Sequence, residues 1–248
     1  MSVATAFPPI TLDELVGEAA LLTRLDRKYL LPVTALPAVL DRMPAGVRML
    51  EIGGRREFAY RSLYFDTPGL DSYLAAAHDR RRRFKVRIRT YLDSGLDFVE
   101  VKTRGARGVT VKERIPYAGD GHRLGDEGEA YTDAVLSAAG IPAPGSGLRP
   151  VLSTHYRRST LHVPGTGSRV TVDSDLVWTL PDGAAVRMPH AVVLETKSAR
   201  AASDVDRMLR SLGHRPCRIS KYATGLAALR PELPANKWHA VLRRHFTS

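Results

Sequence analysis

The stretch FKVRIRTY, residues 84–91, decides the fold that we expect for this chain. Its alternation predicts a β-strand with Lys85, Arg87 and Arg89 on one face and apolar side chains on the other. Cations on one face lie about 7 Å apart, where a pair repels by about 0.6 kcal/mol in water and about 2.4 kcal/mol at an effective dielectric constant of 20. Such a row therefore faces either solvent or an anion.

The same two-faced design recurs along the chain. Residues 96–104 and 109–117 predict two further strands, with Glu100 and Lys102 on the charged face of one and Lys112 on that of the other. Each has an apolar opposite face, as in an antiparallel meander whose charged faces meet on one side of a sheet. For any one strand a solvated charged face remains the simpler interpretation.

Five further strands follow the same rule. They are predicted over residues 23–32, 57–68, 151–163, 168–180 and 191–198. The E-x-K spacing of Glu100 and Lys102 returns in Glu195 and Lys197, with Asp26 and Lys28 as a shorter version. Helices are predicted over residues 11–20, 33–43, 71–79, 131–140, 203–213 and 236–246. The recurrence predicts an α+β fold, with helices beside either a flat sheet or a closed barrel.

Composition indicates what kind of partner suits the chain. Its 248 residues, 44% of them hydrophobic, predict a single domain over residues 1–248. A formal charge of +11 and a pI near 10.1 favour polyanionic partners. Cys217 is the one cysteine, which excludes an intrachain disulfide and favours a cytoplasmic location. We find no signal peptide, no membrane-spanning segment and no Walker-type phosphate loop.

Eight short motifs in order carry a resemblance to a known family. They are RKYLL, LYFDT, KVRIRTY, EVKTR, VKER, HYRRSTL, VLETKS and RISKY. The series resembles the VTC domain, the polyphosphate polymerase module of the triphosphate tunnel metalloenzymes, from about Arg24 to Tyr222. The resemblance implies the second of the two architectures, an antiparallel eight-stranded barrel, or tunnel, with a charged interior and helices packed outside.

The resemblance also implies site residues, motif by motif. The expected catalytic residues are Lys28, Arg87, Arg89, Lys102, Lys112, Arg158, Arg169 and Lys221. The expected phosphate-binding residues are Tyr156, Arg218 and Ser220, and the expected metal ligand is Glu195. Arg218 stands where the family has a lysine, so a planar guanidinium group replaces a compact ammonium group at this position. The wider superfamily's E-x-E-x-K signature is not intact, since the first strand has Arg24 and Asp26 before Lys28.

The activity implied is transfer of the γ-phosphoryl group of ATP to a growing inorganic polyphosphate chain, with Mn²⁺ or Mg²⁺ as cofactor. A tripolyphosphatase or nucleoside triphosphatase of the same fold, and a non-catalytic polyanion-binding module, stay open as alternatives. ATP and polyphosphate are the expected partners. A nucleic-acid partner is not expected, because the basic strands lack interleaved exposed aromatic residues, and a membrane-protein partner is left open.

Simpler interpretations stand beside several of these residues. Glu100 with Lys102, and Glu195 with Lys197, could be ordinary ion pairs of little energetic value if exposed. Asp173 could be a turn residue. The run of four arginines at 80–83 could be a solvated surface or could steer polyanions towards the tunnel mouth.

Overall fold

The computed structural model describes residues 7–18, 25–104, 110–144, 147–164, 168–198 and 202–246. The strands are β1 (Pro9–Ile10), β2 (Leu25–Pro32), β3 (Arg48–Leu50), β4 (Phe58–Asp66), β5 (Arg83–Tyr91), β6 (Leu96–Arg104), β7 (Thr110–Tyr117), β8 (Arg149–Val163), β9 (Ser168–Thr179), β10 (Ala185–Met188) and β11 (Ala191–Ser198). The α-helices are α1 (Leu12–Glu18), α2 (Leu36–Asp41), α3 (Asp71–Ala77), α4 (Gly125–Ala138), α5 (Asp204–Ser211), α6 (Lys221–Leu229) and α7 (His239–His245), with 3₁₀ turns η1 (Val33–Ala35) and η2 (Asn236–Trp238).

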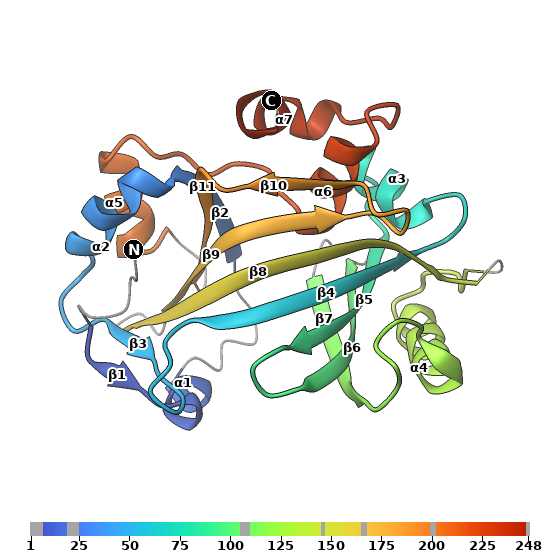
Figure 1. Cartoon of the computed structure of the whole chain (residues 1–248), viewed down its shortest axis with the longest axis horizontal. Coiled ribbons are helices and arrows are strands. Elements are labelled where there is room, and N and C mark those ends of the chain that lie inside the picture. The colour runs from blue at the N-terminus through green and yellow to red at the C-terminus, as the bar shows by residue number, and fades with distance from the viewer. Residues whose placement is uncertain are drawn as a thin grey trace. The chain divides into compact units, whose positions relative to one another are not determined.

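Eight strands form one hydrogen-bonded path in the order β2-β11-β9-β8-β4-β5-β6-β7 (Figure 1). The pairings of β11 with β2 and β9, and of β5 and β6 with their neighbours β4 and β7, are antiparallel. The predicted α+β fold with a large antiparallel sheet is therefore confirmed. Within the described residues the path begins at β2 and ends at β7.

The chain divides into two compact units. Unit 1 comprises residues 1–59, 156–176 and 188–218, and unit 2 comprises residues 60–155, 177–187 and 219–248. The expectation of one domain over residues 1–248 stays a prediction.

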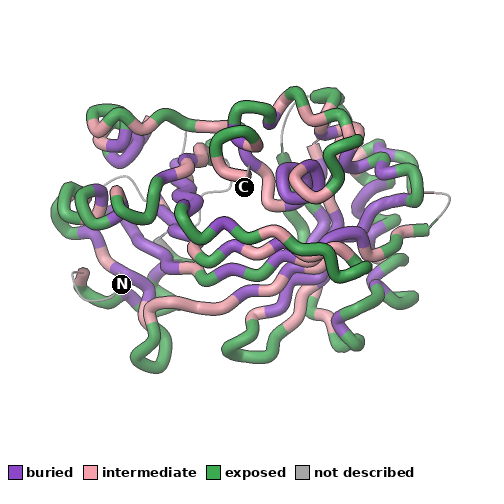
Figure 2. Tube along the Cα trace, turned by 45° about the horizontal axis from the view of Figure 1, so that its top comes forward, coloured by how far each residue is buried: buried purple, intermediate pink, exposed green. Residues whose placement is uncertain are grey.

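The apolar face of the strands in unit 1 packs against two helices. Tyr29 and Leu31 of β2 join Leu194 of β11 in a buried cluster. Val39 of α2 and Leu209 of α5 complete that cluster from the helical side. In β2 the buried residues Tyr29 and Leu31 alternate with less buried ones, whereas every residue of β11 except Lys197 is buried, so both faces of β11 are covered (Figure 2 colours the trace by burial).

A buried carboxylate fixes α5 on this face. Ser203 and Asp206 form a capping box at its start, as expected for a helix beginning there. Asp206 also accepts hydrogen bonds from Tyr29 Oη at 2.8 Å and Thr196 Oγ1 at 2.6 Å. Asp206 is thus satisfied by structural contacts on the apolar side of the strands.

Unit 2 repeats the design with α4. Val86 of β5 and Val99 and Val101 of β6 pack with Leu124 and Leu136 from the α4 region. Helix α4 begins at residue 125, six residues before the predicted start at residue 131, so the helical prediction was too short. The helices therefore cover the apolar faces in both units, and the predicted charged faces lie on the opposite side of each strand.

Candidate phosphate-binding site

Glu195 is the centre of the charged face in unit 1. It is 8% exposed and lies directly across from Lys28 of β2 and Thr171 of β9. The Lys197 ammonium group donates a hydrogen bond to its Oε1. Burial opposes ionisation of Glu195, but Lys197, Lys28 and Arg158 outweigh that effect and hold its pKa well below the usual range. Glu195 is therefore an ionised, buried carboxylate, and it pairs with Lys197 inside the protein rather than at an exposed surface.

Arg158 and Asp173 form a second pair on the same face. Arg158 Nε donates to Asp173 Oδ1 at 2.6 Å and Nη2 donates to Oδ2 at 2.8 Å, a bidentate geometry. Asp173 is fully buried within β9, so its interpretation as a turn residue was wrong. The Arg158 guanidinium also lies 5.4 Å from the centroid of the Tyr156 ring, which places both predicted residues together.

Two residues of β9 complete this face. Arg169 lies directly across from Lys197, and its Nη2 donates to the Leu15 carbonyl at 3.2 Å. Thr171 is 2% exposed, and its Oγ1 has no hydrogen-bond partner within the described part of the chain. A buried hydroxyl beside Glu195 without a partner is costly unless a ligand satisfies it.

Glu100 plays the corresponding part in unit 2. It is 2% exposed, and its Oε2 accepts from Arg87 Nε at 2.8 Å and lies 3.8 Å from Arg89 Nε. Lys112 Nζ lies 2.6 Å from its Oε1. Burial opposes ionisation, but Arg87, Arg89 and Lys112 lower the pKa of Glu100 far below its usual range. Three of the predicted catalytic residues thus converge on one carboxylate, Glu100, for which the sequence offered only an ordinary pairing with Lys102.

Lys112 has an unusual pKa in this cluster. Burial is the main cause of its lowering to about 8, and the nearby Arg87 and Arg89 add to it, while Glu100 opposes it. A pKa of about 8 leaves Lys112, whose side chain is 35% exposed, partly neutral at mildly alkaline pH.

A row of three lysines crosses β5, β6 and β7. Lys85 lies directly across from Lys102, and Lys102 directly across from Lys112. Lys85 Nζ donates to Ser220 Oγ at 3.0 Å. Like charges at directly opposite positions destabilise a sheet, so the row suits a face that meets anions. Lys85 therefore belongs with the predicted ligands although the family motifs did not assign it a role, and its place in the KVRIR alternation was the signal.

The segment around α6 holds the last predicted residues. Ser220 caps α6 by accepting from Ala223 N at 3.1 Å, and Lys221 is the first residue of that helix. Trp178 Nε1 fixes this turn by donating to the Lys221 carbonyl at 2.6 Å. Arg218 is exposed and falls in unit 1, whereas Ser220 and Lys221 fall in unit 2.

The structure therefore groups the predicted residues other than Arg218 in three sets. Lys28, Tyr156, Arg158, Arg169 and Glu195 lie on the charged face in unit 1, and Arg87, Arg89, Lys102 and Lys112 lie on that in unit 2. Ser220 and Lys221 begin α6, also in unit 2, where Ser220 accepts a hydrogen bond from Lys85. Their functional roles stay predictions. In the part of the chain that the structure describes, His, Cys, Asp and Glu side chains form no group of three that could hold a metal ion. The helices described there are too short or too polar to span a bilayer.

Comparison with solved structures shows which class of fold this is. A candidate adenylate cyclase from Bacillus halodurans superposes with a TM-score of 0.50 at 12% sequence identity, over 82% of this chain and 96% of that one. HpAC1 from Hippeastrum, a candidate adenylyl cyclase described as having a dominant triphosphatase activity, superposes with a TM-score of 0.50 at 17% identity, over 87% of this chain and all of that one. The chain has the fold of the triphosphate tunnel metalloenzymes.

Within that class, the chain belongs to the VTC domain family, whose family model matches residues 23–230. This confirms the resemblance seen in the eight motifs. No curated protein matches the chain.

Proposed function

We propose that the chain is a polyphosphate polymerase, which transfers the γ-phosphoryl group of ATP to a growing inorganic polyphosphate chain. The observation that supports this most is the convergence of Arg87, Arg89 and Lys112 on the buried Glu100. Cations on different strands, held in place before a ligand arrives, are what phosphoryl transfer needs, because that reaction depends on positioning and charge stabilisation. Membership of the VTC domain family supports the polymerase assignment.

The protein's own groups would act through charge and geometry. Arg87 and Arg89 present planar forks that match phosphate oxygens, and Lys102 and Lys112 add mobile point charges. On the other charged face, Arg158 is held rigidly by Asp173 and so cannot swing to solvent. No side-chain nucleophile is required, because the terminal phosphate of the acceptor attacks the γ-phosphorus and ADP leaves.

The residues around Glu195 fit a divalent cation that takes most of its ligands from phosphate. Glu195 offers an ionised carboxylate, and the Thr171 hydroxyl, unpaired within the described residues, lies directly across from it. Mg²⁺ and Mn²⁺ prefer such oxygen ligands and commonly bind through one or two protein groups together with substrate phosphates. When bound, the ion would neutralise charge on the transferring phosphoryl group.

Product analysis tests the proposal. Incubation with ATP and Mn²⁺ is expected to give ADP and long polyphosphate chains, separated by gel electrophoresis. Glu195→Gln and Lys221→Ala should each lower the rate strongly, whereas Glu113→Gln, at an exposed position on the other face of β7, should not. Equal activity in all variants would refute the site, and release of orthophosphate alone would favour a triphosphatase, the activity described for HpAC1.

A further inference from the structure

The cations of β5 continue beyond the candidate site in a graded series. Arg89 is 7% exposed, and the side chains of Arg87 and Arg83 are 19% and 21% exposed. These residues alternate along one face of the strand with Lys85 between them. The residues that precede β5, Arg80–Arg82, are exposed. A row of basic side chains therefore runs from a buried position, where Glu100 pairs with Arg87 and Arg89, to the surface.

The neighbouring strand widens this series. Arg83 lies directly across from Arg104 of β6, just as Lys85 lies across from Lys102 one row further in. Successive rows on one face are about 7 Å apart, so the two rows lengthen the cationic face along the strands. The cross-strand pairs Arg83 with Arg104 and Lys85 with Lys102 place four cations on one face. Such a face favours a ligand with many negative charges over one with a few.

Local pairing leaves this region strongly positive. Asp79 accepts from Arg83 Nη1 at 2.6 Å and from Lys237 Nζ at 2.8 Å, so one carboxylate serves two cations. Arg80–Arg82 follow it directly in the sequence. The excess of positive charge thus lies at the exposed end of the series.

We propose that Arg80–Arg83 and Arg104 form an extended binding track for the distal part of a long inorganic polyphosphate chain. The proposal rests on the proposed function, and it adds a preference for long chains over tripolyphosphate. A triphosphate is short enough to be held by the buried cations alone, whereas a long chain also reaches the exposed arginines. None of Arg80–Arg83, Arg104, Lys85 and Lys102 is aromatic, so these residues themselves provide no ring on which a nucleic-acid base can stack.

Binding measurements with the full chain test this track. The variant R80A/R81A/R82A is expected to bind long-chain polyphosphate about tenfold more weakly, at about 0.15 M ionic strength, with unchanged affinity for tripolyphosphate. These arginines are exposed, and a tripolyphosphate-induced rise in Tm equal to that of the wild type shows that the variant is folded.

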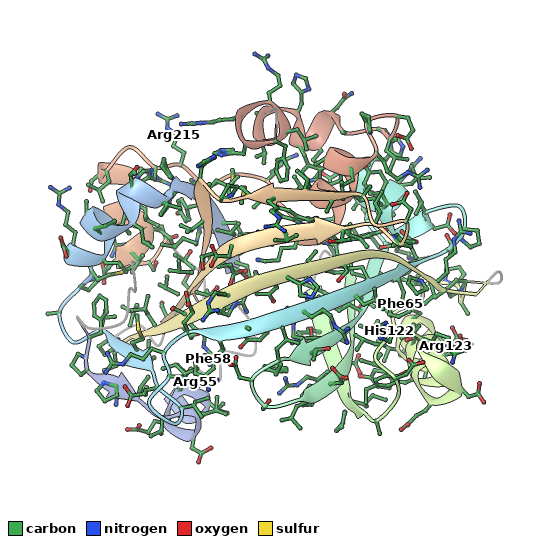
Figure 3. All side chains as sticks on the ribbon, viewed as in Figure 1. Arg55, Phe58, Phe65, His122, Arg123 and Arg215 are labelled. Atoms are coloured by element: carbon green, nitrogen blue, oxygen red, sulfur yellow. The ribbon has the colours of Figure 1, made fainter. Side chains whose placement is uncertain are left out.

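A matched control separates position from net charge. R123A/R243A/R244A removes the same charge from exposed positions in the same unit. Arg123 lies beside α4 (Figure 3), next to Leu124 of the apolar cluster on the opposite side of the strands. The control should keep wild-type affinity for long chains.

Three results would overturn the track. One is equal weakening of tripolyphosphate and long-chain binding in R80A/R81A/R82A, and another is the same loss in the control. The third is that a single-stranded RNA homopolymer binds the wild type as tightly as polyphosphate does, and that R80A/R81A/R82A weakens RNA binding as much as polyphosphate binding. These measurements record binding and need no turnover. A result that contradicts the track is therefore distinguishable from a result that contradicts the polymerase activity.

Discussion

Arg158 and Asp173 are joined by two parallel hydrogen bonds of 2.6 and 2.8 Å, with the carboxylate fully buried. Breaking such a pair leaves an uncompensated charge in the interior, whereas replacing both partners with apolar groups removes the desolvation penalty as well. The pair is therefore a means of holding the Arg158 guanidinium in one orientation rather than a source of stability.

This relationship gives a first prediction. Asp173→Ala should lower the free energy of unfolding by about 3–5 kcal/mol, because Arg158 stays buried without its partner. The double variant Arg158→Leu/Asp173→Leu should recover most of that stability but no turnover. Urea denaturation and the ATP assay measure the two effects. A double variant as unstable as Asp173→Ala would contradict the interpretation.

A second prediction concerns Glu100 as the internal partner of phosphate-binding cations. Glu100→Gln removes a negative charge that competes with phosphate for Arg87 and Arg89, so tripolyphosphate should bind about tenfold more tightly. The ligand-free protein should lose about 2 kcal/mol of stability, because the cations are left without their carboxylate. Calorimetric titration and thermal unfolding check both. Glu113→Gln is the matched control, and weaker binding by Glu100→Gln would show that the carboxylate only positions the arginines.

A third prediction is a pH dependence set by Lys112. With a pKa of about 8, its ammonium form is present below that pH and is lost above it. Phosphate binds the charged form, so affinity for tripolyphosphate should fall as the pH rises through about 8. The ligand's own ionisation also changes with pH, so the wild type is compared with Lys112→Arg, whose guanidinium stays charged. Parallel curves for the two proteins would exclude Lys112 as the cause.

Acid should destabilise the fold through Glu100 and Glu195. Both have folded-state pKa values below the ordinary value of 4.5, so each contributes stability that is fully present above that value. The contribution is lost as the pH falls below about 4.5 towards the depressed pKa. Urea midpoints at neutral and acidic pH should therefore differ less in Glu100→Gln than in the wild type. An equal difference would show that other carboxylates control acid unfolding.

A fifth prediction tests the hydroxyl beside Glu195. Thr171→Val removes a buried polar atom that has no partner in the described residues, so stability should be unchanged or higher by about 1 kcal/mol. If that hydroxyl contributes to metal binding, the Mn²⁺ concentration for half-maximal activity should rise several-fold. Substitution of the adjacent core residue Val172 by Ile is the control. An unchanged Mn²⁺ requirement would remove Thr171 from the site.

The sequence by itself determined the eight strands of the main path and which of their faces carry charge, whereas β1, β3, β10 and helix α6 were not predicted. Alternation depends only on the period of two, so local spacing alone places Arg87 with Arg89, and Glu195 with Lys197, on one face of a strand. The ordered motifs determined the family in the same way, because each is a local pattern. Helix ends were less accurate: α4 begins before the predicted residue because its first turns are rich in glycine and acidic residues rather than apolar ones.

Tertiary structure alone decided which charges meet. Glu100 contacts Lys112 across β6 and β7, and Asp173 holds Arg158 from the neighbouring strand. Which residue lies opposite which follows from strand register and burial, and both are set by long-range pairing that no local pattern encodes. The same is true of pKa values, since the lowered pKa of Lys112 follows from desolvation of its ammonium group and from the nearby Arg87 and Arg89 of β5.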